Sequence, residues 1–438
     1  MKYATGESKK PVSHQDLAKC KKPSPTAIHG AVHALRDMGG LAFVTLRLAG
    51  GAVQCVCPPA LLPEGLCEEC CVELSGTVRD EPRAPGGFEV ATEAVTVLSR
   101  PAAPMPVSLA KRRLDIHLDT ELPLRPALLR HRRRRAVFKV QEGLVRAFRD
   151  YLTGEGFTEV HTPKIVHAGA EGGSNIFKLD YFGKKAYLAQ SPQFYKQTMV
   201  GVFERVFEVG PVFRAEKHAT PRHLNEYTGL DFEMGYISSF YDVIEMETGY
   251  LRRAMELLAQ ECAGELALLG VALPSADKIP CLRFDNAKRL AAEKYGYKIR
   301  DPYDLEPEEE VHIGRYAREE LDSDFVFVTH YPAKKRPFYA MDDPDDPRYT
   351  LSFDLLFRGM EVTTGGQRVH DYAAQVAKMK GRGMDPADFE SYLMIHKCGM
   401  PPHGGLGIGL ERLTMKLCGL DNVRCASLFP RDRSRLEP

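Results

Sequence analysis

The sequence predicts an α+β protein, with a small β-barrel near its N-terminus and a larger antiparallel sheet flanked by helices after it. Three observations predict this arrangement. Short apolar runs separated by glycine pairs fill residues 26–98, a rhythm typical of a small barrel. A stretch with helical periodicity follows at residues 136–156. Beyond it, runs that resemble strands outnumber crossover helices, which favours an antiparallel sheet over a doubly wound one.

The composition is that of an ordinary globular protein. Of 438 residues, 44% are hydrophobic and 27% charged, which allows a large core and two domains. No apolar run approaches the roughly 18 residues of a membrane span. We therefore expect neither a membrane span nor a secretory signal, and a cytoplasmic location is the default. Eleven cysteines in such a chain do not indicate a disulfide scaffold.

We expect residues 1–100 to form the barrel domain, residues 101–132 a hinge or linker, and residues 133–438 the second domain. The proline-rich stretch "RPAAPMPVS" predicts a stiff linker. Residues 111–135 carry nine Lys or Arg against three acids, whereas the whole chain has 59 basic and 59 acidic residues. A nucleic-acid partner would need a local basic patch of this kind. A solvated linker and helix start is the alternative interpretation.

The second domain begins with the helix at 136–156, which ends at a glycine. The elements expected after it are a strand interrupted by Pro163, a strand and helix within 185–200, two strands joined by a polar loop within 205–237, strands at 325–332, 338–343 and 352–365, and a final helix from about Ile408 to Cys418.

The first candidate site is "FRAEKHATPRHLNEYTGLDFEM", residues 213–234, in which Arg214 and Arg222 flank a polar turn. Period-two alternation of the strand after the turn places these side chains on one face: His223, Asn225, Tyr227, Gly229, Asp231 and Glu233. That face suits a charged, planar ligand, because arginine binds phosphate through two donors and an aromatic ring stacks on a base. A solvent-exposed hairpin with ion pairs is the alternative.

Two more clusters lie towards the C-terminus. In "SFDLLFRGMEVTTGGQR" (352–368), Asp354, Glu361 and Thr364 offer the hard oxygen ligands that magnesium prefers, and Arg368 follows two glycines. The stretch "PPHGGLGIGLERL" (401–413) resembles a glycine-rich turn that opens a helix, where anions are favoured. It is not the G-x-G-x-x-G fingerprint, and no P-loop pattern occurs.

Together the three clusters resemble the class II aminoacyl-tRNA synthetases. "FRAE…RHLNEYTGLDFEM" is similar to motif 2 of that family, "GGLGIGLERL" to motif 3, and "GFTEVHTPKI" to motif 1, the proline-containing dimer element. "QSPQFYKQ", "GGQR" and "LFPRDRSRLEP" resemble aspartyl-tRNA synthetases of the archaeal and eukaryotic type. The resemblance spans nearly the whole chain. It implies a homodimer with an N-terminal OB-fold anticodon-binding domain and a class II catalytic domain.

The resemblance also implies the site residues. The catalytic residues would be Arg214, Glu361 and Arg412. ATP would be bound by Arg214, Ala215, Glu216, Arg222, His223, Leu224, Tyr227, Glu361, Gly409, Leu410, Glu411 and Arg412. Aspartate would be bound by Glu171, Gln193, Phe194, Tyr195, Lys196, Arg214, Asp231, Thr364 and Arg368. Mg²⁺ would be held by Asp354, Glu361 and Thr364, although the family usually has Ser at position 364.

The implied reaction joins L-aspartate and ATP into aspartyl-adenylate, after which the terminal ribose of tRNA accepts the aspartyl group. Positioning and neutralisation of phosphate charge do most of the work, so no protein nucleophile is needed. Lys196 and Arg368 would hold the side-chain carboxylate. The lysine at position 196 is why we expect aspartate rather than asparagine as the substrate.

The resemblance bears on the tRNA as well. In the archaeal-type family, a Trp and a Lys accompany enzymes that charge tRNA(Asp) only, whereas a His and a Pro accompany enzymes that also charge tRNA(Asn). The corresponding residues are His33 and Pro85. We therefore expect a non-discriminating enzyme whose Asp-tRNA(Asn) an amidotransferase converts. Neutral substitutions in a strict enzyme, or a synthetase-like paralogue that charges no tRNA, are the alternatives.

Two patterns are set aside. "HIGR" at 312–315 is similar to the HIGH motif of class I synthetases, but no K-M-S-K-S partner exists, so we treat the match as coincidence. Cys55, Cys57 and the cysteines within 67–71 could suggest zinc. Their spacing is irregular, and we expect buried thiols instead.

Overall fold

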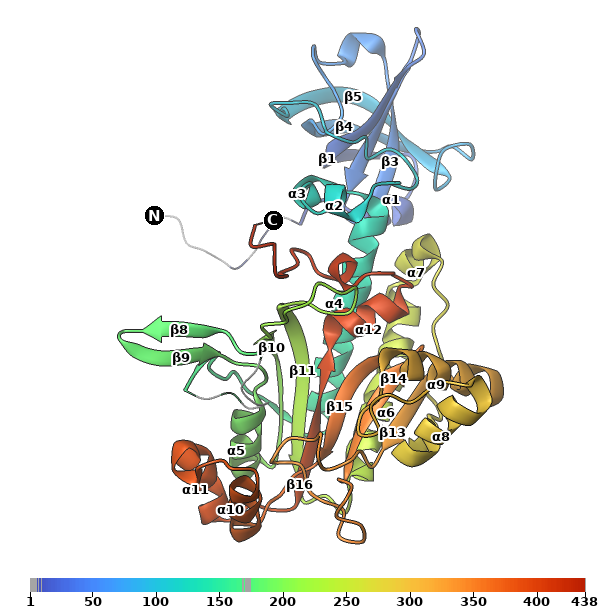
Figure 1. Ribbon diagram of the computed structural model, residues 1–438. Helices are drawn as coiled ribbons and strands as arrows, with labels where there is room; N and C mark the ends of the chain where they lie inside the picture. The colour runs from blue at the N-terminus through green and yellow to red at the C-terminus, as the bar shows by residue number, and fades with distance from the viewer. Residues whose placement is uncertain (1–5, 7, 9, 168, 170–174, 438) are drawn as a thin grey trace. The chain divides into compact units, whose positions relative to one another are not determined.

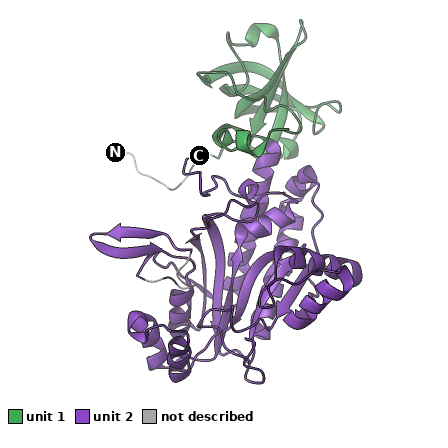
Figure 2. Cartoon of the chain, in the orientation of Figure 1, with its two compact units in different colours: residues 1–131 green, residues 132–438 purple. Residues whose placement is uncertain are grey.

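The computed structural model describes residues 6, 8, 10–167, 169 and 175–437. The chain divides into two compact units, residues 1–131 and 132–438, which Figure 2 distinguishes by colour. None of the helices in the described part of the chain is long and apolar enough to cross a bilayer.

The first unit is built on a closed five-stranded barrel with the strand order β1-β2-β3-β5-β4. Its elements are α1 (His14–Lys19), β1 (Ser24–Asp37), β2 (Ala42–Leu48), β3 (Gly51–Cys57), η1 (Pro59–Leu61), β4 (Cys71–Asp80), β5 (Phe88–Ser99), α2 (Leu118–Glu121) and α3 (Arg125–Leu128). Alternate residues of β2 are buried, as expected where one face of a strand points into a barrel. The predicted barrel is confirmed.

The cysteines of this unit differ in exposure. Cys55, Cys57 and Cys70 are buried as expected, but Cys67 and Cys71 are exposed, so the expectation of buried thiols is wrong for these two. Cys67 lies in the loop before β4, and Cys71 is the first residue of that strand, where the chain leaves the surface loop. The described residues contain no cluster of three or more His, Cys, Asp or Glu side chains able to hold a metal ion.

The second unit is organised around an eight-stranded sheet with the order β12-β13-β14-β15-β16-β11-β10-β6 (Figure 1). The sheet strands are β6 (Thr158–Glu159), β10 (Arg205–Phe213), β11 (Glu226–Gly235), β12 (Cys281–Arg283), β13 (Phe325–Thr329), β14 (Ser352–Phe357), β15 (Glu361–Gln367) and β16 (His403–Gly409). The pairs from β13 to β10 are antiparallel, as predicted, and only the edge strands β12 and β6 are parallel to their neighbours.

Helices cover the sheet and its ends. They are α4 (Arg132–Gly154), α5 (Gln193–Phe203), α6 (Tyr241–Glu261), α7 (Ala263–Leu269), α8 (Phe284–Tyr295), α9 (Pro307–Glu320), α10 (Tyr372–Gly381), α11 (Glu390–Cys398) and α12 (Leu410–Leu417), with short turns η2 (Pro386–Phe389) and η3 (Val423–Ala426). A separate three-stranded sheet consists of β7 (Ile165–Val166), β9 (Lys184–Leu188) and β8 (Lys178–Tyr181).

The core of this unit lies between one face of the sheet and the helices α4 and α6 (Figure 1). On α4, Leu144 and Phe148 are four residues apart and therefore share a face, and both are fully buried. Leu230 and Phe232 of β11 point into the same core. Because side chains alternate along a strand, the residues between them point to the opposite face of the sheet.

Three predicted elements are wrong in detail. The first helix begins at Arg132 rather than at residue 136, because four consecutive arginines, which are good helix formers, continue it. The stretch "HGGLGIG" is the strand β16 inside the sheet and not a turn, so the last helix begins at Leu410. Residues 338–343 form no strand but only isolated bridges at Ala340 and Asp342.

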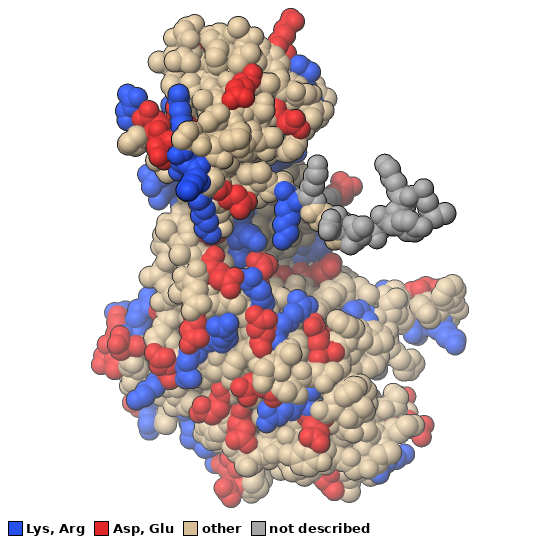
Figure 3. Space-filling view, turned by 180° about the vertical axis from the view of Figure 1, so that it is seen from behind, with Lys and Arg blue, Asp and Glu red and all other residues tan. Residues whose placement is uncertain are grey.

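Several arginines of the basic segment 111–135 make ion pairs or hydrogen bonds within their own unit of the protein. Arg125 is buried with Glu121 at 2.8 Å, and Arg130 lies 2.8 Å from Glu69. Arg133 donates to the backbone carbonyl of Leu268. Elsewhere on the visible face of residues 132–438, Lys and Arg side chains are intermixed with Asp and Glu (Figure 3). These arginines therefore support the structural interpretation of the segment.

Candidate active site

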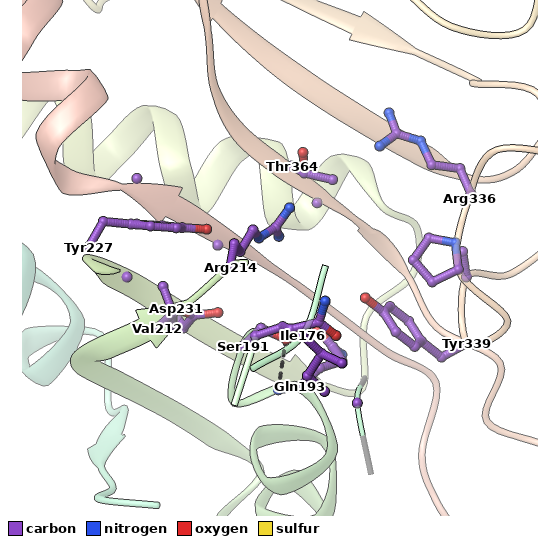
Figure 4. Close-up of a pocket in the computed structure, with 18 of the residues that line it drawn as sticks. Ile176, Ser191, Gln193, Val212, Arg214, Tyr227, Asp231, Arg336, Tyr339 and Thr364 are labelled. Carbon is purple, nitrogen blue, oxygen red and sulfur yellow. Dashed lines mark hydrogen bonds between the residues drawn. The ribbon is translucent and has the colours of Figure 1, made fainter. Parts of the chain in front are cut away.

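A cavity of about 1130 Å³ opens on the sheet face opposite the α4–α6 core. Its floor comes from β11, β15 and β16, and one wall comes from the start of α5. Figure 4 shows Tyr227, Arg214 and Asp231 from the β10–β11 side, with Arg336 and Tyr339 on another wall. The three sequence clusters therefore meet in one cavity.

Four buried charged side chains lie together at one end of the cavity, and Lys196, Asp231 and Arg368 line it. Lys196 Nζ donates to Asp231 Oδ1 at 2.9 Å and to the Leu406 carbonyl at 2.7 Å, and it lies 3.4 Å from Glu233 Oε2. Arg368 Nε donates to Glu233 Oε1 at 2.8 Å. Two cations and two carboxylates are thus interlocked with little access to water, a geometry that fixes all four side chains.

The environment affects the two carboxylates differently. Burial raises the pKa of Asp231, and the neighbouring Lys196 opposes that rise. Burial would also raise the pKa of Glu233, but Arg368 and Lys196 outweigh it and leave that pKa below its usual value. Glu233 is therefore the ionised group that holds both cations in place.

Glycines make room for these carboxylates. A Cβ on Gly405 would lie 2.2 Å from the Phe232 carbonyl oxygen and 2.3 Å from Glu233 Oε2. A Cβ on Gly407 would lie 3.0 Å from Asp231 Oδ1. The glycines of β16 therefore serve close packing of the acidic strand β11 against its neighbour, rather than a turn.

A second set of charged groups forms the other end of the cavity. Arg222, in the β10–β11 loop, lies 2.6 Å from Glu310 Oε2 through its Nη2. Arg412 donates from Nε to the Arg222 carbonyl at 3.2 Å and from Nη1 to the Glu361 carbonyl at 3.2 Å. The arginine of α12 thus connects the β10–β11 loop to the start of β15.

Glu361 is the carboxylate around which the arginines at this end gather. Burial alone would raise its pKa, but nearby guanidinium groups lower the pKa below its usual value. The arginines responsible are Arg412, Arg222, Arg336 and Arg214. Guanidinium groups gathered around this carboxylate offer the donors that a phosphate-bearing ligand needs.

Aromatic and polar groups line the part of the cavity next to the loop. Tyr227 and His223 both line it, and His223 Nδ1 lies 2.5 Å from Thr220 Oγ1. Glu411 accepts the backbone N–H of Thr228 at 3.0 Å, and burial raises its pKa to about 7. Leu224 also lines the cavity, although it packs into a small apolar cluster beneath it.

The three predicted magnesium ligands lie on neighbouring strands. Asp354 of β14 is the direct cross-strand partner of Thr364 on β15, and Thr364 Oγ1 donates to Glu361 Oε1 at 3.3 Å. Glu361 and Thr364 line the cavity, whereas Asp354 lies behind Arg336, 2.8 Å away. Glu361 and Thr364 thus offer a carboxylate and a hydroxyl to the cavity, with the second carboxylate, Asp354, paired behind them, and oxygen donors of these kinds are those that Mg²⁺ prefers.

Several predicted residues lie elsewhere. Among the described residues, the lining of the cavity includes Arg214, Glu216, Gln193 and Gly409 but not Ala215, Phe194, Tyr195 or Leu410. Phe194 packs instead with Phe338 and Tyr392, because a helix presents only one face to the cavity. Glu171 falls outside the described residues.

The sequence motifs missed other residues of the cavity. Arg336 and Tyr339 line it from the segment between β13 and β14, and Arg336 also stacks 3.8 Å from the centre of the Tyr331 ring. Glu310 of α9 does not line the cavity, but it accepts from Arg222, which does. The run "KKRPFY" after a buried strand could have pointed to Arg336 and Tyr339. No sequence signal distinguished Glu310 from the acidic residues around it.

The two residues of the barrel lie in different settings. His33 is half-buried at a β-bulge, between Val32 and Ala34, where the register of β1 against β2 shifts. Pro85 is exposed in the loop between β4 and β5. The Gly87 N–H donates to the Ala84 carbonyl at 2.9 Å, so Pro85 is the second residue of a tight turn.

Family models match both units. One described as "tRNA synthetases class II (D, K and N)" matches residues 117–433, and one described as "OB-fold nucleic acid binding domain" matches residues 26–98. Among solved structures, asparaginyl-tRNA synthetase from Pyrococcus horikoshii, complexed with asparaginyl-adenylate, has a TM-score of 0.90 at 31% identity. The match covers 98% of this chain and 100% of that one.

The relatives carry two kinds of name. Aspartate–tRNA(Asp/Asn) ligases from Deinococcus radiodurans and Thermus thermophilus are each 49% identical, over 94% and 93% of this chain and 95% and 96% of theirs. Aspartate–tRNA(Asp) ligase from Pyrococcus abyssi is 37% identical over 94% of this chain and 95% of its own. With its catalytic sheet, its barrel and these matches, the chain belongs to the class II tRNA synthetases of the D, K and N group.

Proposed function

We propose that this aminoacyl-tRNA synthetase activates L-aspartate with ATP and transfers the aspartyl group to tRNA(Asp) and also to tRNA(Asn). The observation that carries the choice of amino acid is the buried pair of cations, Lys196 and Arg368, at one end of the cavity. If Asp231 turned to the substrate ammonium group, Lys196 would lose its 2.9 Å carboxylate partner, which an aspartate side chain would replace and an asparagine amide would not. Each 1.4 kcal/mol or so of that penalty is about tenfold in selectivity.

The fold alone does not select between the two amino acids, because an asparaginyl-tRNA synthetase superposes on nearly the whole chain. The charges support aspartate instead. Asp231, which accepts from Lys196, would take the α-ammonium group, and Gln193 lines the same cavity. Lys196, released from Asp231, would then face the side-chain carboxylate, with Arg368 held beside it by Glu233.

In the activation step, an oxygen of the aspartate α-carboxylate attacks the α-phosphorus of ATP. The new P–O bond forms as the bond to pyrophosphate breaks, and no protein group becomes covalently attached. Arg214 and the Arg222–Arg412 pair would neutralise the phosphates, and Tyr227 would stack on the adenine. Mg²⁺, held by Asp354, Glu361 and Thr364, would supply further charge neutralisation when bound.

Charging of two tRNAs is supported by the barrel and by relatives named for both tRNAs. Pro85 has no N–H and no side-chain donor, and it lies in an exposed turn where it can offer little discrimination between base edges. His33 is smaller than the tryptophan of strict readers. A cytosine or a uracil could then be accommodated at the third anticodon position.

Two further properties follow from the same proposal. The edge strand β6, in the motif 1 segment, would contribute to a homodimer. Sedimentation analysis would measure the mass of that dimer. Asp-tRNA(Asn) is a mischarged product, so an amidotransferase acting on the tRNA-bound aspartate would have to consume it.

The deciding experiment measures aspartate-dependent ATP–pyrophosphate exchange and then charging of both tRNAs by the purified chain. We expect exchange with aspartate but not asparagine, and charging of both tRNAs at comparable enzyme concentrations. A strictly discriminating aspartyl-tRNA synthetase, the second candidate, would charge tRNA(Asp) alone. A chain that shows no exchange would be a paralogue without this activity.

A further inference from the structure

The helix α9 lies outside the three sequence motifs yet is fixed against the cavity. A Cβ on Gly314 would lie 2.4 Å from the backbone nitrogen of Gly359, in the turn just before β15. Gly359 has a φ of +72°, and a Cβ there would approach the Val311 Cα at 3.0 Å. This contact explains the glycine of "HIGR": it lets α9 touch the turn that precedes Glu361.

The end of the cavity that holds Arg222, Glu361 and Arg412 is named the phosphate end. One residue of α9 joins two segments of it. Glu310 is buried, and its Oε2 accepts both Arg222 Nη2 at 2.6 Å and the backbone N–H of Glu361 at 2.8 Å. Arg412 connects the same two residues through their carbonyl oxygens, each at 3.2 Å. The β10–β11 loop, α9, β15 and α12 are thereby tied together around Glu361.

A carboxylate beside a triphosphate site needs a reason, because its own charge repels the phosphates. Glu310 engages only Nη2 of Arg222, and Arg222 Nε is buried with no hydrogen-bond partner in the described part of the chain. Arg222 also lines the cavity. The Arg222 side chain is 17% exposed, so a guanidinium group held at Nη2 by Glu310 still presents donors to a ligand in the cavity.

We propose that Glu310 is a positioning residue for ATP: it holds the Arg222 guanidinium and the start of β15 in the arrangement that receives the phosphates. This inference rests on the proposed function of the cavity, and it deepens it. Two opposite effects can be separated. If charge repulsion dominated, removal of Glu310 would strengthen ATP binding; if positioning dominates, removal weakens it, because Arg222 is no longer pre-organised.

The test uses the full chain with Glu310→Gln and Glu310→Ala, and it measures pyrophosphate exchange against ATP and against aspartate. We expect KM for ATP to rise about tenfold in the alanine variant and about threefold in the glutamine variant, which keeps an acceptor, while KM for aspartate changes less than about twofold. Glu309→Gln is the matched control. Glu309 is a buried acid of the same helix, but it pairs with Lys288 at 2.7 Å outside the cavity.

A double-mutant cycle with Arg222→Ala completes the test. If Glu310 acts through Arg222, Glu310→Gln should change KM for ATP less than about twofold in the Arg222→Ala background. Thermal unfolding of every variant separates a loss of fold from a loss of ATP binding. An unchanged or lowered KM for ATP in folded Glu310→Ala and Glu310→Gln would overturn the inference. An absence of aspartate-dependent exchange in the unmodified chain would instead refute the proposed function.

Discussion

The eight-stranded sheet and the N-terminal barrel hold their predicted functional residues in opposite ways. In the sheet, Lys196, Asp231, Glu233 and Arg368 are buried and bonded to one another, so each side chain depends on the others. In the barrel, the core is largely aliphatic, and the predicted recognition residues His33 and Pro85 lie at a bulge and in an exposed turn.

This contrast has consequences for substitution. Removing one member of a buried ion pair leaves its partner uncompensated, which costs several kcal/mol. Replacing an exposed turn residue leaves the backbone and the core as they are. Changes in the sheet should therefore abolish a step of the reaction, whereas changes at the two barrel positions should shift the preference between tRNAs.

The most severe test of the contrast is Arg412→Lys. Lysine keeps the charge but has a single nitrogen in place of the separate Nε and Nη1 donors that reach the Arg222 and Glu361 carbonyls, so the connection between these two segments is weakened. We expect kcat/KM for ATP in pyrophosphate exchange to fall about 100-fold or more. Arg358→Lys is the control, because Arg358 also bonds a carbonyl and a carboxylate but does so outside the cavity. Similar losses in both variants would contradict a specific role for Arg412.

The second test changes the amino-acid end through Lys196→Gln. The variant leaves Asp231 and Glu233 with one cation fewer, and we expect kcat/KM for aspartate to fall about 50-fold while rejection of asparagine weakens. Lys288→Gln is the matched control, since Lys288 is a buried lysine with three oxygen partners outside the cavity. Exchange assays with both amino acids would decide. Unchanged selectivity in Lys196→Gln would remove the argument for aspartate.

The third test concerns stability, and it uses His403 at the start of β16. Burial lowers the pKa of His403 from 6.5 to about 4. Gln197 Nε2 lies 2.9 Å from His403 Nε2, and the Tyr392 hydroxyl donates to Gln197 Oε1 at 3.2 Å. The side-chain amide thus donates to the ring, which must be neutral at Nε2 to accept.

Because the unfolded chain binds a proton near pH 6.5 and the folded chain only near pH 4, stability is constant above that range and falls as pH decreases through it. Between pH 7.5 and 5 the loss due to this group is about 2 kcal/mol. Urea unfolding followed by circular dichroism, compared between the unmodified chain and His403→Gln, should show a difference of that size. Parallel pH dependence in both proteins would show that His403 titrates in the folded state as it does in the unfolded one.

Much of the catalytic unit could be predicted because its chemistry is local in sequence. The alternation of Tyr227, Gly229 and Asp231 on β11 indicated the substrate floor, and these residues do line one cavity. The glycines of β16 misled us, since glycine is common in turns. The packing of β11 against β16 is needed to see the reason: a side chain at position 405 would occupy the space of the Glu233 carboxylate.

Other contacts could not be predicted because they join segments far apart in the chain. Glu310 lies in an acidic helix that looks like a solvated surface, and its 2.6 Å contact with Arg222 spans 88 residues. Arg336 comes from an irregular segment without periodicity. Phe194, expected at the substrate, faces an aromatic cluster because the helix phase, not its motif, decides which side chains reach the cavity.

The smallest expected effect lies in the barrel, where His33→Trp with Pro85→Lys should change tRNA preference without changing amino-acid activation. Lysine is tolerated at the exposed second position of the 84–87 turn, and it restores a donor that can be held against one base edge. His33 lies at a bulge that interrupts the pairing of β1 with β2, and a larger ring at a bulge displaces no ladder hydrogen bond. We expect charging of tRNA(Asn) to fall about tenfold and charging of tRNA(Asp) to stay within about twofold, a difference of about 1.4 kcal/mol.

Pyrophosphate exchange without tRNA should be unchanged, and Arg83→Lys in the same loop serves as the control for a change that keeps charge. Equal losses on both tRNAs would mean that the barrel positions act on tRNA binding in general, and the contrast between an interdependent catalytic site and a replaceable recognition surface would then fail at its weaker end.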